Sequence, residues 1–119
     1  MSKKIIHAAL LGLGTVGTGV YKVLKSQEEE MEQKIGAAVA IKKILVRNLK
    51  KAAAKLQEPE LLTDSWQEIL EDESIDIIIE VMGGIHPAKE YITAALRAGK
   101  HVVTANKDLV ASFGGELLD

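Results

Sequence analysis

Apolar residues occur in short continuous runs along this chain, and each run is separated from the next by a segment with helical spacing. The longer runs occupy residues 5–11, 39–46 and 75–82, and shorter ones occupy residues 61–63 and 101–104. Continuous apolar runs of this length are typical of strands that are buried on both faces of a parallel sheet. The pattern therefore predicts a strand at each of these places.

Between the runs, apolar side chains recur every three or four residues, which is the spacing of one helix face. This spacing predicts helices over residues 15–34 and 50–56, and a third helix that reaches about Leu70. Asp64 together with Gln67 resembles a capping pair for the start of the third helix. The helices thus alternate with the predicted strands.

A fourth helix is predicted between the last two strands. Pro87 suits its first turn, and Gly99 suits its end. The residues after Asn106 also have helical spacing. Strands that alternate with helices indicate βαβ units with right-handed crossovers, and hence a parallel sheet. The expected fold class is α/β, a doubly wound parallel sheet with strand order 3-2-1-4-5 in a single domain.

Chemically suggestive residues follow the predicted strands at one edge of the sheet. They lie at residues 12–14, 46–48, 82–84 and 104–107. In a doubly wound sheet, ligands bind beyond the carboxyl ends of the strands. Because these segments fall on that same edge, we expect a single binding site there.

Gly12, Gly14 and Gly17 form the pattern G-x-G-x-x-G between the first strand and the first helix. The first glycine allows a tight turn, the second lets the backbone approach a pyrophosphate, and the third lets helix and strand pack closely. The helix start offers free N–H groups and the positive end of its dipole to phosphates. The pattern predicts a dinucleotide site, and an ordinary glycine turn is the alternative.

Arg47 stands at the end of the second strand, where dinucleotide-binding chains usually carry an acidic residue for the ribose 2′-hydroxyl. It is followed by Asn48, Lys50 and Lys51. A guanidinium at this place can hold the 2′-phosphate of NADP through charge-assisted hydrogen bonds. NADP is therefore favoured over NAD, and a solvated basic turn is the alternative.

Other candidates lie near the ends of the later strands. Gly83 and Gly84 let the backbone pass close to a cofactor ribose or nicotinamide, or they serve a turn with positive φ. Glu80 is expected to be buried, where a structural hydrogen bond is favoured over catalysis. Thr104 and Lys107 close the last cluster, and residue type alone favours a surface lysine at 107 over a group that assists proton transfer.

Composition excludes several classes of protein. The chain has 119 residues, 47% of them hydrophobic and 27% charged, with a net charge of −2. Such a chain is not disordered, lacks the basic excess of nucleic-acid binders, and has no apolar run near the ~18 residues of a membrane span. It has no cysteine, its histidines form no metal motif, and it fits a cytoplasmic protein.

Several motifs together resemble the N-terminal cofactor domain of homoserine dehydrogenase, which has a Rossmann-type fold. They are GLGTVGTGV at residues 12–20, VRN at 46–48, DIIIEVMGG at 76–84, AKEYITAAL at 88–96 and GKHVVTANKDLVA at 99–111. The resemblance covers essentially the whole chain in order. The EVMGG and TANKDL segments are its most specific parts.

The resemblance implies NAD(P)-dependent interconversion of L-homoserine and L-aspartate 4-semialdehyde, on the route to threonine, methionine and isoleucine. It implies that Lys107 is a catalytic residue that contacts cofactor and substrate, which reverses the interpretation from residue type. The backbone around Leu13, Thr15 and Val16 would bind the pyrophosphate. Arg47 would lie near the adenosine ribose or its 2′-phosphate.

The family continues into a dimerisation and substrate domain, which supplies a second catalytic lysine and a monovalent-cation site. Residues 1–119 are accordingly expected to form the NAD(P)-binding domain, to end before the substrate domain, and to bind dinucleotide without turnover. The full-length enzyme would take a small amino-acid substrate, form a homo-oligomer through the other domain, and have no nucleic-acid or membrane partner. The alternatives are a dinucleotide-sensing regulatory module and a related amino-acid or semialdehyde dehydrogenase.

Overall fold

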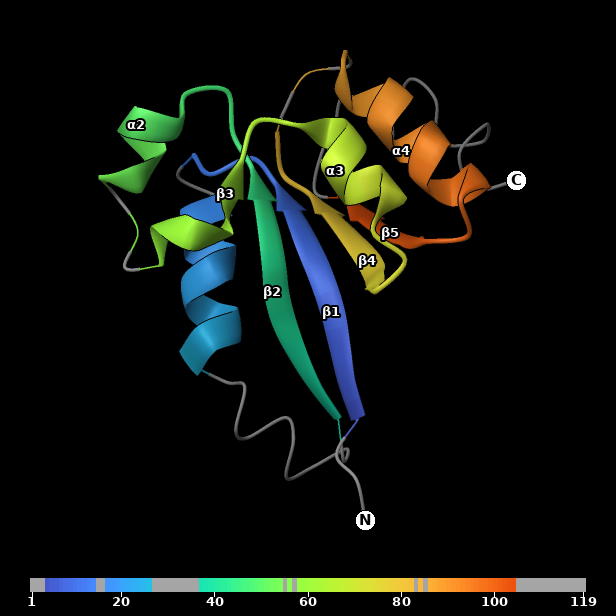
Figure 1. Ribbon diagram of the computed structural model, residues 1–119, viewed down its shortest axis with the longest axis horizontal. Coiled ribbons are helices and arrows are strands. Elements are labelled where there is room, and N and C mark those ends of the chain that lie inside the picture. The colour runs from blue at the N-terminus through green and yellow to red at the C-terminus, as the bar shows by residue number, and fades with distance from the viewer. Residues whose placement is uncertain are drawn as a thin grey trace.

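The computed structural model contains one parallel sheet with helices on both faces (Figure 1). It describes residues 4–14, 17–26, 37–54, 56, 58–82, 84 and 86–104. In these residues five strands pair in the order β3-β2-β1-β4-β5, which confirms the expected fold class and strand order. The strands are β1 (Lys4–Leu11), β2 (Ala37–Leu45), β3 (Leu62–Thr63), β4 (Ile75–Glu80) and β5 (His101–Thr104).

The helices match the predicted alternation with small shifts at their ends. Residues 17–26 are helical, and the later elements are α2 (Leu49–Ala53), the 3-10 turn η1 (Pro59–Leu61), α3 (Trp66–Glu71) and α4 (Ala88–Arg97). The predicted continuation of the first helix over 27–34 lies outside the described residues. Pro87 stands one position earlier than expected, at the N-cap of α4 rather than in its first turn.

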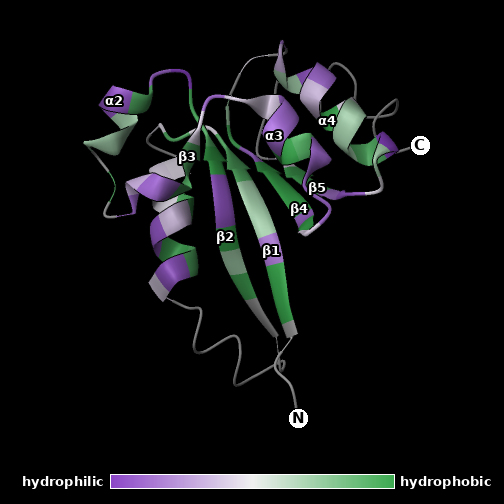
Figure 2. Cartoon of the chain, viewed as in Figure 1, coloured by the Kyte–Doolittle hydropathy of each residue, from purple (hydrophilic) through white to green (hydrophobic). Residues whose placement is uncertain are grey.

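The central strand β1 separates two apolar layers. Ala8 and Leu10 pack with Tyr21 of the first helix, on the face that Ala52 of α2 also joins. Ala9 and Leu11 point the other way and pack with residues of α3 and α4. Figure 2 shows the sheet largely apolar, with polar residues on the outer sides of the helices. Burial on both faces is the physical reason why the second half of this strand, residues 8–11, is apolar at every position.

Helix α3 begins at a different residue from the one that the sequence indicated. The N-cap is Ser65, whose side chain accepts a hydrogen bond from the backbone N–H of Glu68 at 3.3 Å. Asp64 was therefore the wrong capping residue, by one position. Ser65 has the extended backbone that a cap requires, with φ −106° and ψ 105°. Asp64 is instead exposed.

Gly99 ends α4, as predicted. Its φ is +83°, its N–H donates to the carbonyl of Leu96 at 3.1 Å, and the N–H of Lys100 donates to the carbonyl of Ala95 at 3.0 Å. This pair of bonds is the Schellman motif, which satisfies carbonyls that the helix leaves unpaired. The turn brings the chain directly from α4 into β5.

Tyr21 joins the first helix to the segment before η1. Its hydroxyl donates a hydrogen bond to Glu58, which also forms an ion pair with Lys25 at 3.0 Å. Burial, followed by the bond to Glu58, raises the pKa of Tyr21 to about 12. The hydroxyl therefore remains protonated and keeps donating at any ordinary pH.

Three charged residues stabilise the amino edge of the sheet, opposite the expected site. Lys100 is buried, and its Nζ donates to the carbonyls of Asp72 at 2.7 Å and Ile75 at 2.8 Å. The carboxylate of Asp72 accepts from the N–H and hydroxyl of Ser74 and pairs with Lys42 of β2 at 2.9 Å. The Ser74 hydrogen bonds, followed by Lys42, hold the pKa of Asp72 well below its usual range.

We expect Asp72→Asn to lower the free energy of unfolding by about 1 kcal/mol at pH 7, because it weakens an ion pair and two charge-assisted hydrogen bonds. A carboxylate with a depressed pKa stabilises the fold above its unfolded pKa of about 4 and loses that effect as the pH falls further. In urea denaturation, the free energy of unfolding of the variant should therefore be lower than that of the unmodified chain by a constant amount from pH 8 to 5, and the difference should shrink below about pH 4. Asp76→Asn, at an exposed position of β4, is the control. A difference that does not change with pH would contradict the depressed pKa of Asp72.

Candidate functional site

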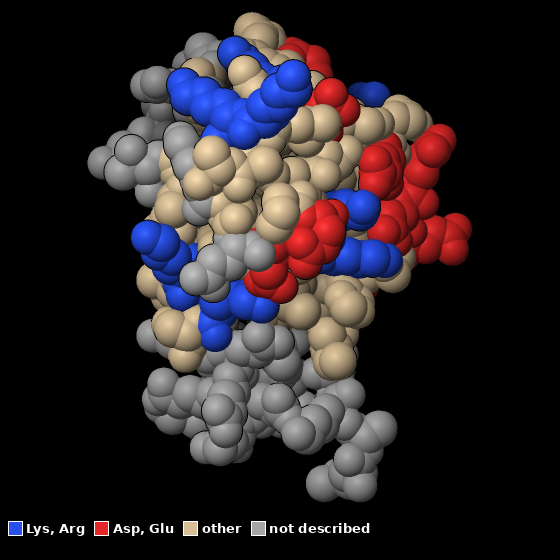
Figure 3. Space-filling model, turned by 60° about the vertical axis from the view of Figure 1, so that its left-hand side comes forward, with Lys and Arg blue, Asp and Glu red and all other residues tan. Residues whose placement is uncertain are grey.

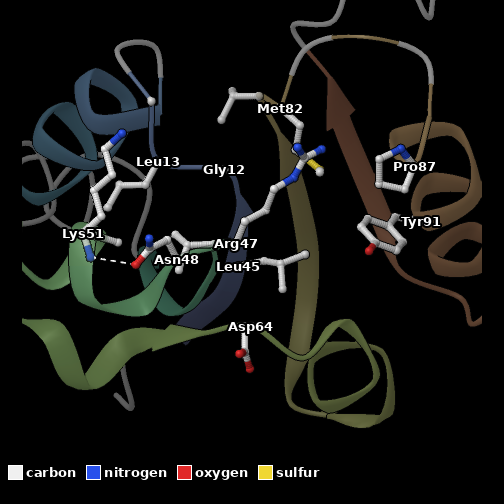
Figure 4. Close-up of a pocket in the computed structure, with 14 residues that line it drawn as sticks. Gly12, Leu13, Leu45, Arg47, Asn48, Lys51, Asp64, Met82, Pro87 and Tyr91 are labelled. Carbon is white, nitrogen blue, oxygen red and sulfur yellow. Dashed lines mark hydrogen bonds between the residues drawn. The ribbon is translucent and has the colours of Figure 1, made fainter.

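A cavity of about 690 Å³ lies at the carboxyl edge of the sheet, above the arrowheads of Figure 1. The segments that follow β1, β2 and β4 border it together with the start of α4 (Figure 4). Its lining residues are Gly12, Leu13, Gly14, Leu45, Val46, Arg47, Asn48, Lys51, Ala52, Asp64, Val81, Met82, Pro87 and Tyr91. The structure thus joins three of the segments that the sequence placed at one edge.

The turn after β1 leaves no room for side chains at two of its glycines. Gly12 has a φ of +105°, and a Cβ there would lie 3.3 Å from the Cα of Met82. A Cβ on Gly17 would lie 2.5 Å from the carbonyl oxygen of Gly12, closer than real contacts allow. These two glycines therefore let the first helix pack directly against the turn and the end of β4.

Gly14 has a different role in the same turn. It is exposed on the cavity, and a Cβ there would meet no atom within 4 Å. A side chain at this position would fill part of the open space. With glycine there, a ligand can approach the protein backbone closely. The carbonyl of Gly14 accepts from the N–H of Thr18 at 2.9 Å, which closes the first turn of the helix. Open space beside the second glycine is a general feature of turns that bind a pyrophosphate.

The end of β2 supplies a basic border to the cavity. Arg47 and Lys51 are exposed and line it, and Figure 4 shows the Arg47 side chain extended from the end of β2. Asn48 caps α2, because its side chain accepts from the N–H of Lys51 at 3.0 Å. Helix α2 also carries Lys50, and Figure 3 shows Lys and Arg gathered over this part of the surface. Cations on this border favour an anionic ligand.

The opposite wall of the cavity is largely apolar. It is formed by Met82 after β4 and by Pro87 and Tyr91 at the start of α4. The ring of Tyr91 stacks on Trp66 of α3, with centroids 4.6 Å apart and planes inclined by 23°. Trp66 also packs against the core, so it connects Tyr91 to the interior of the fold. Such a wall suits the flat, uncharged parts of a ligand.

The predicted site residues fall into three groups. Gly12, Leu13, Gly14 and Arg47 line the cavity, whereas Gly17 lies behind the turn. Gly84, with a φ of +74°, and Thr104 are described but do not line the cavity. The remaining four, Thr15, Val16, Gly83 and Lys107, lie outside the described residues.

The sequence did not indicate the apolar wall, and Tyr91 was not among the predicted site residues. The signal that could have revealed it is positional. Pro87 and Tyr91 are one helical turn apart at the start of a helix that follows a strand of the site. In a doubly wound fold, that turn lies at the carboxyl edge.

A family model described as "Homoserine dehydrogenase, NAD binding domain" matches residues 12–119. The chain belongs to this family. Homoserine dehydrogenase from Bacillus subtilis is 45% identical over 115 residues, a match that covers 97% of this chain and 27% of the relative. The enzyme from Corynebacterium glutamicum is 44% identical over 114 residues, covering 96% and 25%.

Solved structures of the family share the fold. Homoserine dehydrogenase from Thiobacillus denitrificans superposes with a TM-score of 0.88 at 44% identity, covering 97% of this chain and 26% of that one. The Staphylococcus aureus enzyme at pH 6.5 gives 0.89 at 43% identity, covering 97% and 29%. The chain thus spans 25–27% of the length of the two curated relatives named above. Among the described residues, no helix is long and apolar enough to span a membrane.

The glycine turn of this family member can be tested by its packing. Gly17→Ala should lower the free energy of unfolding by about 1–3 kcal/mol, because the new Cβ overlaps the carbonyl of Gly12. Gly19→Ala, in the same helix but with no atom within 4 Å of the added Cβ, should instead raise it by about 0.5–1 kcal/mol. Urea denaturation of both variants measures the contrast, and equal effects at the two positions would refute it.

Proposed function

We propose that residues 1–119 form the dinucleotide-binding domain of a homoserine dehydrogenase and bind NADP or NAD in the cavity at the carboxyl edge. The observation that carries this proposal is the glycine turn. Side chains are disfavoured at Gly12 by its positive φ and at Gly17 by the carbonyl of Gly12, while Gly14 leaves open space on the cavity. Membership of the family supports the same ligand class.

The arrangement of the edge orients the ligand along the sheet. The pyrophosphate would lie over the turn at Gly12 and Gly14, next to the start of the first helix. Because β2 and β4 flank β1 on opposite sides, the adenosine would extend toward Arg47 and the nicotinamide toward the end of β4. Met82 lies on that second side of the cavity.

The cofactor supplies the redox chemistry when it is bound, by giving or taking a hydride at the nicotinamide ring. In the full-length enzyme this hydride would be exchanged with C4 of L-homoserine or L-aspartate 4-semialdehyde. Lys107, three residues beyond the end of β5, would contact cofactor and substrate and orient the reacting carbonyl. The remaining substrate contacts and the homo-oligomer would come from the part of the relatives that this chain does not cover.

NADP is the favoured cofactor. Arg47 stands where an acidic residue would hold the 2′-hydroxyl of NAD, and Lys51 lines the same side of the cavity. A guanidinium can bind a phosphate with paired, directional hydrogen bonds, and a nearby ammonium adds charge. Both residues are exposed at the cavity border, so a 2′-phosphate could reach them without being buried.

Titration of the chain with NADPH and NADH, followed by cofactor fluorescence, tests the proposal. We expect both to bind, NADPH about tenfold more tightly, since a charge-assisted phosphate contact contributes about 1.5 kcal/mol. Arg47→Ala should remove most of this preference, and Arg97→Ala, at the far end of α4, should preserve it. A preference that survives Arg47→Ala would remove that residue from the role, and absence of binding by both cofactors at millimolar concentration would refute the proposed function.

The role of Lys107 is tested in the full-length enzyme. Lys107→Met should lower kcat by at least about a hundredfold, the contribution typical of a positioned proton-transfer group, while the circular dichroism spectrum stays close to that of the unmodified enzyme. Turnover within a few fold of the unmodified enzyme would exclude Lys107 from the reaction.

A further inference from the structure

Glu80 is a completely buried carboxylate at the carboxyl end of β4, with 0% of its surface exposed. A charge in such a place destabilises the fold unless hydrogen bonds compensate it. Both of its oxygens are bonded: Oε2 accepts from the backbone N–H of Met82 at 2.7 Å, and Oε1 accepts from the hydroxyl of Thr104 at 2.5 Å. The carboxylate therefore links the segment after β4 to the end of β5.

Simple filling of the core does not require a charge at this position. Leu11 and Leu45 occupy the corresponding ends of β1 and β2, and both are buried apolar residues. Glu80 is aligned with Leu11 on one side and with Thr104 on the other. A leucine at position 80 would satisfy the apolar neighbours but would leave the N–H of Met82 without this acceptor. The carboxylate is thus explained by the two groups that it holds.

The two bonded groups lie on the same side of the sheet, and one of them, Met82, lines the cavity. The backbone of Met82 lies against the glycine turn, 3.3 Å from where a Cβ of Gly12 would be. Thr104 is the last residue of β5 and precedes Lys107 by three positions. Both segments are on the β4–β5 side of β1, opposite the β2 end that carries Arg47.

The β2 half of the site has its own anchor. The N–H of Gly12 donates to the carbonyl of Leu45 at 2.9 Å, so the start of the turn is tied to the end of β2. The border at Arg47 and Asn48 follows directly from that strand. Loss of the Glu80 bonds should therefore loosen one half of the cavity and leave the other in place.

We propose that Glu80 is a positioning residue for the nicotinamide half of the dinucleotide. It holds the backbone at Met82 and the end of β5, and thereby sets the wall against which that half binds. This inference rests on the proposed function, since it assigns a role within the same dinucleotide site. Glu80 thus has a different proposed role from Arg47, which would bind the adenosine half.

The chemistry of the bonds distinguishes substitutions at position 80. Glutamine keeps one acceptor for the N–H of Met82, and its amide group can donate to the hydroxyl of Thr104, which can reverse its role. Leucine has a similar size but can make neither bond. If positioning is the function of Glu80, Glu80→Gln should retain much of the NADPH affinity that Glu80→Leu loses.

The experiment compares the affinities of the chain for NADPH and for 2′,5′-ADP, which lacks the nicotinamide half. Glu80→Leu should weaken NADPH binding at least tenfold and change 2′,5′-ADP binding by less than twofold, and Glu80→Gln should weaken NADPH binding by less than threefold. Thr104→Val keeps the bond from Glu80 to Met82 and tests the inference if the leucine variant does not fold. It should weaken NADPH binding about threefold with 2′,5′-ADP unchanged.

Equal losses for both ligands in the folded variants would overturn the inference, because a general loss of stability does not distinguish the two halves. Unchanged NADPH affinity in Thr104→Val and Glu80→Leu would also overturn it. If the unmodified chain binds neither ligand, the proposed function fails and the inference fails with it. Binding by the unmodified chain together with equal losses in the variants overturns the inference alone.

Discussion

Burial of β1 on both of its faces is the constraint on which the rest of the structure depends. Residues Ala8, Ala9, Leu10 and Leu11 have no exposed surface. A stretch of strand buried in this way must be apolar at every position, must have a hydrogen-bonded neighbour on each side, and must have helices on both faces. Once the faces are closed, the carboxyl edge is where backbone turns and a ligand can meet. The glycine turn therefore follows this strand directly.

The two edges of the sheet use charge in different ways. At the amino edge, Lys100, Asp72 and Lys42 are bonded to protein groups and hold the fold together. At the carboxyl edge, Arg47 and Lys51 face the cavity from exposed positions. An interior charge such as Lys100 must be compensated by protein groups, whereas an exposed charge at the cavity border can bind a ligand.

Much of the fold and part of the site follow from local patterns. Continuous apolar runs indicate buried strands, and their alternation with helices indicates a doubly wound parallel sheet, for which the observed order 3-2-1-4-5 is the expected one. The spacing of Gly12, Gly14 and Gly17 predicts the turn. Local patterns did not distinguish Asp64 from Ser65 as the N-cap of α3, because both side chains can cap a helix and only the path of the backbone selects one of them.

The order of residues along the chain was sufficient for the fold class, the glycine turn, the basic end of β2 and the resemblance to the family, because each depends on neighbours in sequence. Contacts between distant segments depended on the folded structure. The bonds from Glu80 to Met82 and Thr104, and the place of Tyr91 on the cavity wall, required the register of β4 and β5 and the packing of α4. Lys100 shows the reason most clearly: a lysine is expected at the surface, and only the folded chain brings two carbonyls from 25 and 28 positions away to its ammonium group.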